Sequence, residues 1–104
     1  MSASATYQVV WPRSERTVAF KPMAPRHASL AGKKVALLWD HVFRGDEIWE
    51  ILKPELSARY PGISFVDHDV FGNTHGHDEH EVVAAIPGKL RELGVDAVVS
   101  GVGC

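Results

Sequence analysis

The chain has 104 residues, of which 45% are hydrophobic and 23% are charged. These values are typical of one globular domain and exclude a disordered or collagen-like protein. Thirteen acidic and eleven basic residues leave a formal net charge of −2, whereas a nucleic-acid-binding domain usually carries a basic excess, so no nucleic-acid partner is expected.

The sequence shows no sign of a membrane span or a secretory signal. Its longest clean apolar run, Val35 to Trp39, is far shorter than the ~20 residues that cross a bilayer. The first ten residues, MSASATYQVV, lack a basic region followed by an apolar one. We therefore expect a cytoplasmic protein. The single cysteine, Cys104, excludes an intrachain disulfide framework and a multi-cysteine zinc site.

Residues 1–32 are predicted to form an extended arm that precedes an α/β domain over residues 33–104. Pro12, Pro22 and Pro25 each lack a backbone N–H and fix φ, which disfavours a helix in this segment. Extended arms of this kind often pack over a neighbouring surface.

The first part of the predicted domain reads as a strand followed by a helix. The run KKVALLWD suits a strand that is buried on both faces. A helix is expected from Gly45 to about Tyr60, with Pro54 kinking it or marking a restart. One face of this helix would carry its apolar residues, which are Ile48, Ile51, Leu52, Leu56 and Tyr60.

The second half repeats this alternation. Residues 63–66 (ISFV) favour a short strand, and Asp78 with Glu81 suggests a capping box that begins a second helix. Gly94 suits the position just after that helix, and VDAVVSGVGC predicts a third buried strand. The apolar side of the second helix would consist of Val82, Val83, Ile86, Leu90 and Leu93.

The order strand–helix–strand–helix–strand predicts a small three-stranded parallel sheet with two crossover helices. Right-handed crossovers give the strand order 2-1-3, which resembles half of a Rossmann or flavodoxin-like fold. So few elements make a thin domain, and the third strand lacks a following helix to cover it. The chain looks cut off within a motif, so either a partner chain completes the sheet or the natural polypeptide continues.

The residues with chemical potential follow the three strands. Ligands of open parallel sheets bind beyond the carboxyl ends of the strands, where Asp40, His75, His77 and Cys104 are expected to meet. Gly72 and Gly76 bracket Thr74 and His75, and Gly101 and Gly103 form a short G-x-G turn. These glycines would let the backbone approach a ligand closely.

Three stretches, APRHASLAGKKVALLWD, FGNTHG and LGVDAVVSGVGC, resemble the UGSC family of bacterial selenoproteins and their cysteine homologues. The resemblance covers about residues 24–104. In that family the third strand runs into a motif in which selenocysteine or cysteine is followed by Gly-Ser-Cys. This chain ends at Cys104, where the resemblance implies that the reactive residue comes next, so we expect a product that stops before a selenocysteine codon.

The resemblance implies a thiol- or selenol-dependent redox or substrate-activating protein that acts on a small molecule or a thiol. The reactive residue would follow Cys104, with His75 as the acid–base partner and Asp40 or Thr74 lining the pocket. Cys104 itself is the neighbour of that residue or a nucleophile in its own right. No cofactor is certain beyond the suspected selenocysteine.

Two other functions stay open. Seven polar residues lie within fourteen positions, namely Asp67, His68, Asp69, His75, His77, Asp78 and His80. Imidazole and carboxylate groups bind zinc, nickel or non-haem iron, so His75, His77 and His80 are candidate ligands of a divalent metal. Alternatively, the chain is a non-catalytic half-domain that forms a homo-oligomer or requires a partner subunit.

Overall fold

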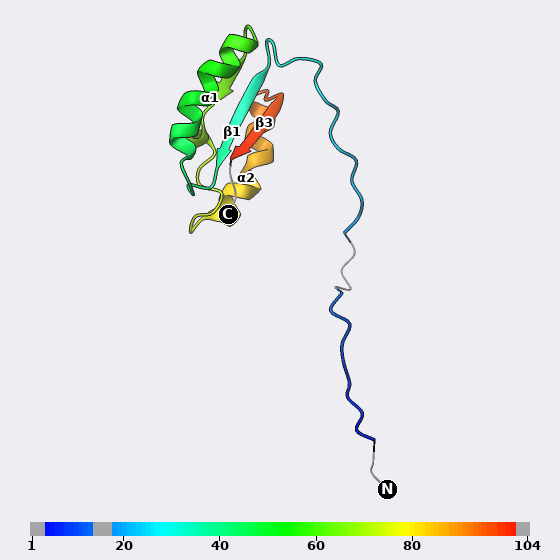
Figure 1. Ribbon diagram of the computed structural model, residues 1–104. Helices are drawn as coiled ribbons and strands as arrows, with labels where there is room; N and C mark the ends of the chain where they lie inside the picture. Colours follow the sequence, from blue (N-terminus) through cyan, green and yellow to red (C-terminus); the bar gives the residue numbers. More distant parts are fainter. Residues whose placement is uncertain (1–3, 14–17, 102–104) are drawn as a thin grey trace.

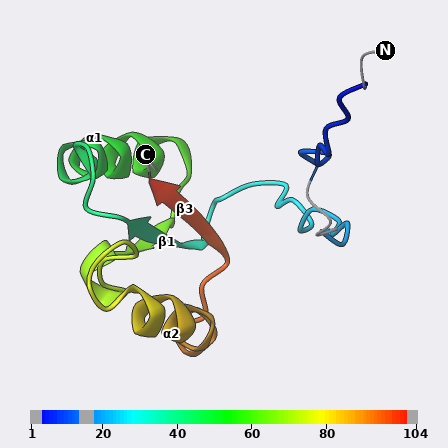
Figure 2. The same ribbon diagram turned by 90° about the horizontal axis from the view of Figure 1, so that it is seen from below.

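The computed structural model describes residues 4–13 and 18–101 and contains a three-layer α/β body (Figure 1). Its elements in chain order are β1 (Lys34–Trp39), α1 (Gly45–Arg59), β2 (Ser64–Val66), the single 3₁₀ turn η1 (His68–Val70), α2 (Glu79–Glu92) and β3 (Ala97–Gly101). The strands are parallel in the order β2-β1-β3, as predicted. Figure 2 shows α1 and α2 on opposite sides of the sheet.

The central strand β1 supplies most of the core. Val35, Ala36 and Leu37 are fully buried, and successive side chains of a strand point to opposite faces. Val35 and Leu37 pack with Trp49 of α1, so one face of β1 lies under that helix. The prediction of a strand buried on both faces is confirmed.

The buried face of α1 differs from the predicted one. Ile48 and Ile51 are exposed, whereas Trp49 retains only 5% of its accessible surface. Leu52 packs against the same core. Because the Trp49 indole packs against β1, Ile48 and Ile51 lie on the side of the helix that faces solvent. Pro54 lies inside a continuous α1, so the expected kink or restart does not end the helix.

The ends of α2 follow the sequence prediction only in part. Asp78 occupies the N-cap position, but its side chain makes no capping hydrogen bond, so the predicted capping box is wrong. Gly94 has a φ of +64°, and the N–H groups of Gly94 and Val95 donate to the Arg91 and Leu90 carbonyls. These two bonds form a Schellman motif. Val83, predicted to face inward, is exposed.

Strand β3 is buried on one side only. Ala97 and Val99 pack against the core, while Val98 and Ser100 are exposed. The sequence prediction of a buried third strand is therefore only half correct. The face of β3 that carries Val98 and Ser100 is therefore the more exposed one.

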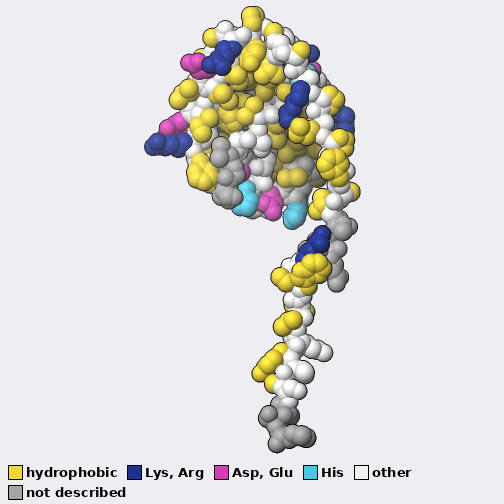
Figure 3. Space-filling view, turned by 45° about the vertical axis from the view of Figure 1, so that its right-hand side comes forward, with side chains coloured by type: hydrophobic (Ala, Val, Ile, Leu, Met, Phe, Trp, Pro, Cys, Tyr) yellow, Lys and Arg dark blue, Asp and Glu magenta, His cyan; other side chains and the backbone are white. Residues whose placement is uncertain are grey.

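The N-terminal arm extends away from the body (Figure 1), and the molecule measures 82 Å along its longest axis. Neither residues 4–13 nor residues 18–33 contain a helix or strand. Figure 3 shows hydrophobic side chains spaced along the arm. Across both described stretches of the chain, no helix has the length and apolar character needed to cross a membrane.

Candidate functional site

The carboxyl edge of the sheet is organised around Trp39, the last residue of β1. Trp39 pairs with Gly101 of β3 on one side and forms a parallel bridge with Asn73 on the other. Asn73, Trp39 and Gly101 therefore lie in one row across the sheet. The residues that follow each of them leave the same edge, which is where parallel α/β sheets bind their ligands.

Thr74 is fixed directly to this row. Its backbone N–H donates to the Trp39 carbonyl over 3.4 Å, and its hydroxyl lies 3.5 Å from the same oxygen. Thr74 is half-buried. The loop after β2 thus pairs with the end of β1 at Asn73. Thr74 bonds to Trp39, the residue that precedes Asp40.

Asp40 forms the turn that leaves β1. Its Oδ1 accepts a hydrogen bond of 3.1 Å from the Val42 N–H, and the Trp39 indole N–H donates to the Val42 carbonyl over 2.9 Å. His41 and Phe43 have φ values of 60° and 63°, which β-carbon-bearing residues rarely adopt. Strained backbone of this kind often occurs at functional sites.

His75 lies at the same edge but faces α2. Its backbone N–H donates to Asn73 Oδ1 over 2.9 Å, and its Nδ1 lies 3.5 Å from Glu79 Oε2 in the first turn of α2. The side chain is 65% exposed. His75 is thus accessible and held in place by its loop.

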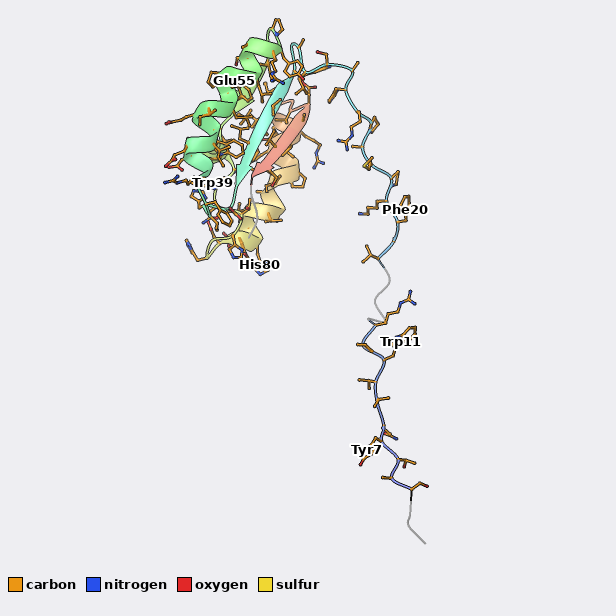
Figure 4. All side chains as sticks on the ribbon, in the orientation of Figure 1. Tyr7, Trp11, Phe20, Trp39, Glu55 and His80 are labelled. Atoms are coloured by element: carbon orange, nitrogen blue, oxygen red, sulfur yellow. The ribbon has the colours of Figure 1, made fainter. Side chains whose placement is uncertain are left out.

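The histidines proposed as metal ligands do not form one group. His77 is 98% exposed, with its Nδ1 4.0 Å from Asp78 Oδ1, and His80 is exposed on α2 (Figure 4). Within residues 4–13 and 18–101, no three histidine, cysteine or acidic side chains are positioned to hold a metal ion. The structure therefore does not bring His75, His77 and His80 together.

The glycines differ in what surrounds them. Gly72 has a φ of +89°, which favours glycine, and Gly76 lies close to Asn73 and Asp78. A β-carbon at Gly101 would lie 2.7 Å from the Trp49 ring, so Gly101 allows packing rather than ligand approach. The predictions for Gly103 and Cys104 lie outside the described residues.

Two histidines at this edge, His41 and His68, were not predicted as site residues, although His68 belongs to the polar cluster noted in the sequence. His41 stacks on Trp39 with 4.4 Å between ring centroids, and His68 meets Trp39 edge-on at 5.0 Å. The two imidazoles are 5.6 Å apart. The available signal was position, because His41 follows β1 by two residues and His68 follows β2 by two.

A family model described as the UGSC family matches residues 8–104. The match includes most of the N-terminal arm as well as the whole α/β body. Neither a curated protein nor a solved structure gives a significant match.

Proposed function

The chain belongs to the UGSC family, and from that premise we propose that it serves thiol- or selenol-dependent redox or substrate-activating chemistry. The reacting residue is the cysteine or selenocysteine that the family pattern has directly after Cys104. His75 is its acid–base partner, and Asp40 and Thr74 line the pocket. The substrate class is a small electrophile or a disulfide.

The observation that carries this proposal is the row formed by Asn73, Trp39 and Gly101. The chain segments that follow these three residues all leave the same edge of the sheet. A nucleophile in the segment after β3 therefore starts from the edge that carries Asp40 and Thr74. His75 is two residues beyond Asn73 and exposed. Proximity of a nucleophile to an acid–base group is the basic requirement of such catalysis.

For a disulfide substrate the step balances without a further reactant. The thiolate or selenolate attacks one sulfur, its bond to that sulfur forms, and the substrate S–S bond breaks. The product is a mixed disulfide or selenenyl sulfide plus a leaving thiolate. His75, as the general acid, gives a proton to that thiolate.

The first test is to sequence the gene beyond codon 104. An in-frame UGA or cysteine codon followed by Gly-Ser-Cys supports the proposal. A UAA or UAG codon, or UGA without an open frame behind it, contradicts it.

The second test compares His75→Gln with His77→Gln in the full-length protein. His77 is the matched control because it lies two residues away and is 98% exposed. Loss of a general acid should slow disulfide reduction about 100-fold or more, whereas His77→Gln should retain the wild-type rate. Equal rates for the two variants would exclude the role of His75.

A second function, a half-domain completed by another chain, is favoured by a different observation. The arm carries exposed aromatic and aliphatic residues, and β3 leaves Val98 exposed at the edge of the sheet. Apolar surface of this extent commonly marks an interaction site. This reading requires no catalytic role for His75, so the variants above distinguish the two functions.

A further inference from the structure

Strand β3 forms one lateral side of the sheet. Among the described residues it pairs with β1 and with no other strand, so every second residue of β3 points its backbone N–H and C=O groups away from the sheet. Its five residues, AVVSG, include no charged residue and no proline, which are usual features that keep a free strand from pairing. Strand β2, at the opposite side, has only three residues. The outer edge of β3 is therefore an open pairing surface.

A groove follows this outer edge. It has a volume of about 340 Å³ and lies between β3 and residues 24–30 of the arm. Ala97 packs against the core, whereas its neighbour Val98 is 41% exposed. Successive side chains of a strand point to opposite faces, and both of these residues line the groove. The groove therefore runs along the edge of the strand rather than over one face. The arm contacts the start of this edge through His27, whose Nε2 lies 2.9 Å from the Asp96 carbonyl oxygen.

The lining of the groove favours an apolar occupant. Five of its eight residues are apolar, namely Ala24, Pro25, Leu30, Ala97 and Val98. Its volume is at the lower end for small-molecule sites, which is enough for one large side chain. An extended segment that pairs with the outer edge of β3 and inserts such a side chain would cover both surfaces, as in β-strand addition.

The arm contains a segment with the character of such a strand. Residues 7–11, YQVVW, are rich in β-branched and aromatic residues, which are the types favoured in strands. In an extended chain Tyr7, Val9 and Trp11 lie on one face, and Tyr7 and Trp11 are 85% and 76% exposed. The segment matches β3 in length and carries no charged residue, so its pairing with β3 would bury no unpaired charge.

A second copy of the chain is better placed than the same copy to supply this segment. The arm extends away from its own body (Figure 1), and Pro12, Pro22 and Pro25 stand between the segment and β1. Each proline restricts φ and favours an extended backbone, which opposes a return of residues 7–11 onto their own β3. The same stiffness carries the segment toward a neighbouring molecule.

Exchange of two arms buries an area close to that of a stable dimer. A buried aromatic side chain removes about 150–250 Å² from solvent, so Tyr7 and Trp11 of two arms together remove about 600–1,000 Å². The valines of the segment and the receiving groove add to this area. Stable interfaces bury about 1,200–2,000 Å² in total, and exchange of an identical element is a common route to a two-fold dimer.

We propose that residues 7–11 of one copy pair with the outer edge of β3 of a second copy as a fourth strand, and that the second copy returns the same contact. An aromatic side chain of the segment occupies the groove. This inference rests on the half-domain proposal above in that a second chain completes the sheet, and it identifies that chain and its contact. A monomeric chain would overturn it without bearing on His75, and an inactive His75→Gln variant would not bear on it.

The first test locates the receiving surface by sedimentation velocity of the full chain over a range of concentrations. Val98→Lys places a charge in the groove and should raise the dissociation constant of the dimer at least tenfold. The matched control is Val83→Lys, which changes a valine of α2 that is 51% exposed and should leave the constant unchanged. Ser100→Lys, at an exposed residue of β3, replaces Val98→Lys if that variant fails to fold. A wild-type monomer at every concentration, or equal effects of the β3 and α2 changes, overturns the proposal.

The second test locates the donated segment. The double change Val9→Pro with Val10→Pro removes two consecutive backbone N–H groups, one of which faces β3 in either register. It should raise the dissociation constant at least tenfold. The control, Ala5→Pro with Thr6→Pro, adds two prolines to the same arm before the segment and should leave the constant unchanged. Equal constants for the two double variants would exclude backbone pairing by residues 7–11.

The third test mixes the two weakened variants at a concentration where each alone is monomeric. Val98→Lys keeps an intact arm, and the Val9→Pro, Val10→Pro variant keeps an intact β3. One arm can then still pair with one β3, so the mixture should form heterodimers that sediment faster than either variant alone. Association of arms with arms, or of β3 with β3, gives no such recovery. A mixture that remains monomeric overturns the exchange.

Discussion

At the scale of single residues, Trp39 joins the parts of the candidate site. Its backbone pairs with Asn73 and Gly101, and its indole N–H holds the turn at Val42. Its ring contacts His41 and His68. One residue therefore fixes the β1 turn, the loop after β2 and the end of β3 relative to one another.

Two glycine substitutions should change stability in opposite directions. An added β-carbon at Gly101 would lie 2.7 Å from the Trp49 ring, and such overpacking costs about 1–3 kcal/mol. Gly88 lies inside α2 with no atom within 4 Å of the added carbon. Gly88→Ala should therefore stabilise the protein by about 0.5–1 kcal/mol, the helix-propensity difference.

Urea unfolding of the wild type, Gly101→Ala and Gly88→Ala measures both effects. If Gly101→Ala unfolds at the wild-type urea concentration, Trp49 is not packed against β3. If Gly88→Ala is destabilising, the space beside Gly88 in α2 is filled in solution.

At the scale of elements, the sequence predicted the strands better than the helix faces. The run around Val35 and Leu37 identified β1 because a strand buried on both faces is apolar throughout. The spacing of apolar residues in α1 did not determine which side of the helix is buried, because the neighbouring residues Ile48, Trp49, Ile51 and Leu52 are all apolar. In the structure, Trp49 and Leu52 pack against the core around β1. The spacing of apolar residues alone does not predict this packing.

The candidate site was predictable to a similar extent. Parallel topology predicted that Asp40, His75, His77 and Cys104 would meet at the carboxyl edge; among the described residues, Thr74, the residue before His75, bonds to Trp39, the residue before Asp40. The stacking of His41 on Trp39 depends on the left-handed backbone of His41. Nothing in the local sequence specifies that conformation, since non-glycine residues disfavour it.

The interior proline of α1 provides a prediction for this element. Pro54 lacks the N–H that would bond to the preceding turn, and an interior proline costs about 3 kcal/mol relative to alanine. Proline also restricts the unfolded chain, which offsets about 0.4–1 kcal/mol. Pro54→Ala should therefore raise the free energy of unfolding by about 2 kcal/mol.

Thermal and urea unfolding followed by circular dichroism measures this change. Pro12→Ala is the control because Pro12 lies in the exposed arm, and its replacement should leave the midpoint unchanged. A lower midpoint for Pro54→Ala would mean that the proline is favoured by its surroundings in α1.

At the scale of the whole molecule, the N-terminal arm extends away from the body (Figure 1), and only near its end does His27 Nε2 lie 2.9 Å from the Asp96 carbonyl oxygen. Seven of its large apolar side chains, Tyr7, Val9, Val10, Trp11, Val18, Phe20 and Met23, are between 76% and 94% exposed. Figure 4 shows Tyr7, Trp11 and Phe20 far from the sheet. The family match begins at residue 8, so most of this arm belongs to the family pattern.

We expect the arm to drive association between copies of the chain, because exposed apolar surface is an interaction site. The double substitution Trp11→Ser and Phe20→Ser should shift sedimentation toward the monomer at a given protein concentration. The matched control, Ser4→Ala with Gln8→Ser, changes two exposed polar residues of the same arm and should not shift it. A wild-type chain that sediments as a monomer at every concentration would contradict this expectation.

The three tryptophans lie in three different environments, which their fluorescence can report separately. Trp11 is exposed on the arm, Trp39 is stacked on an imidazole at the sheet edge, and Trp49 is buried under β1. Indole fluorescence shifts to longer wavelength in water, and a stacked neighbour alters its intensity. Variants that keep one tryptophan each therefore give separate fluorescent reporters of the arm, the edge and the core, without any added label.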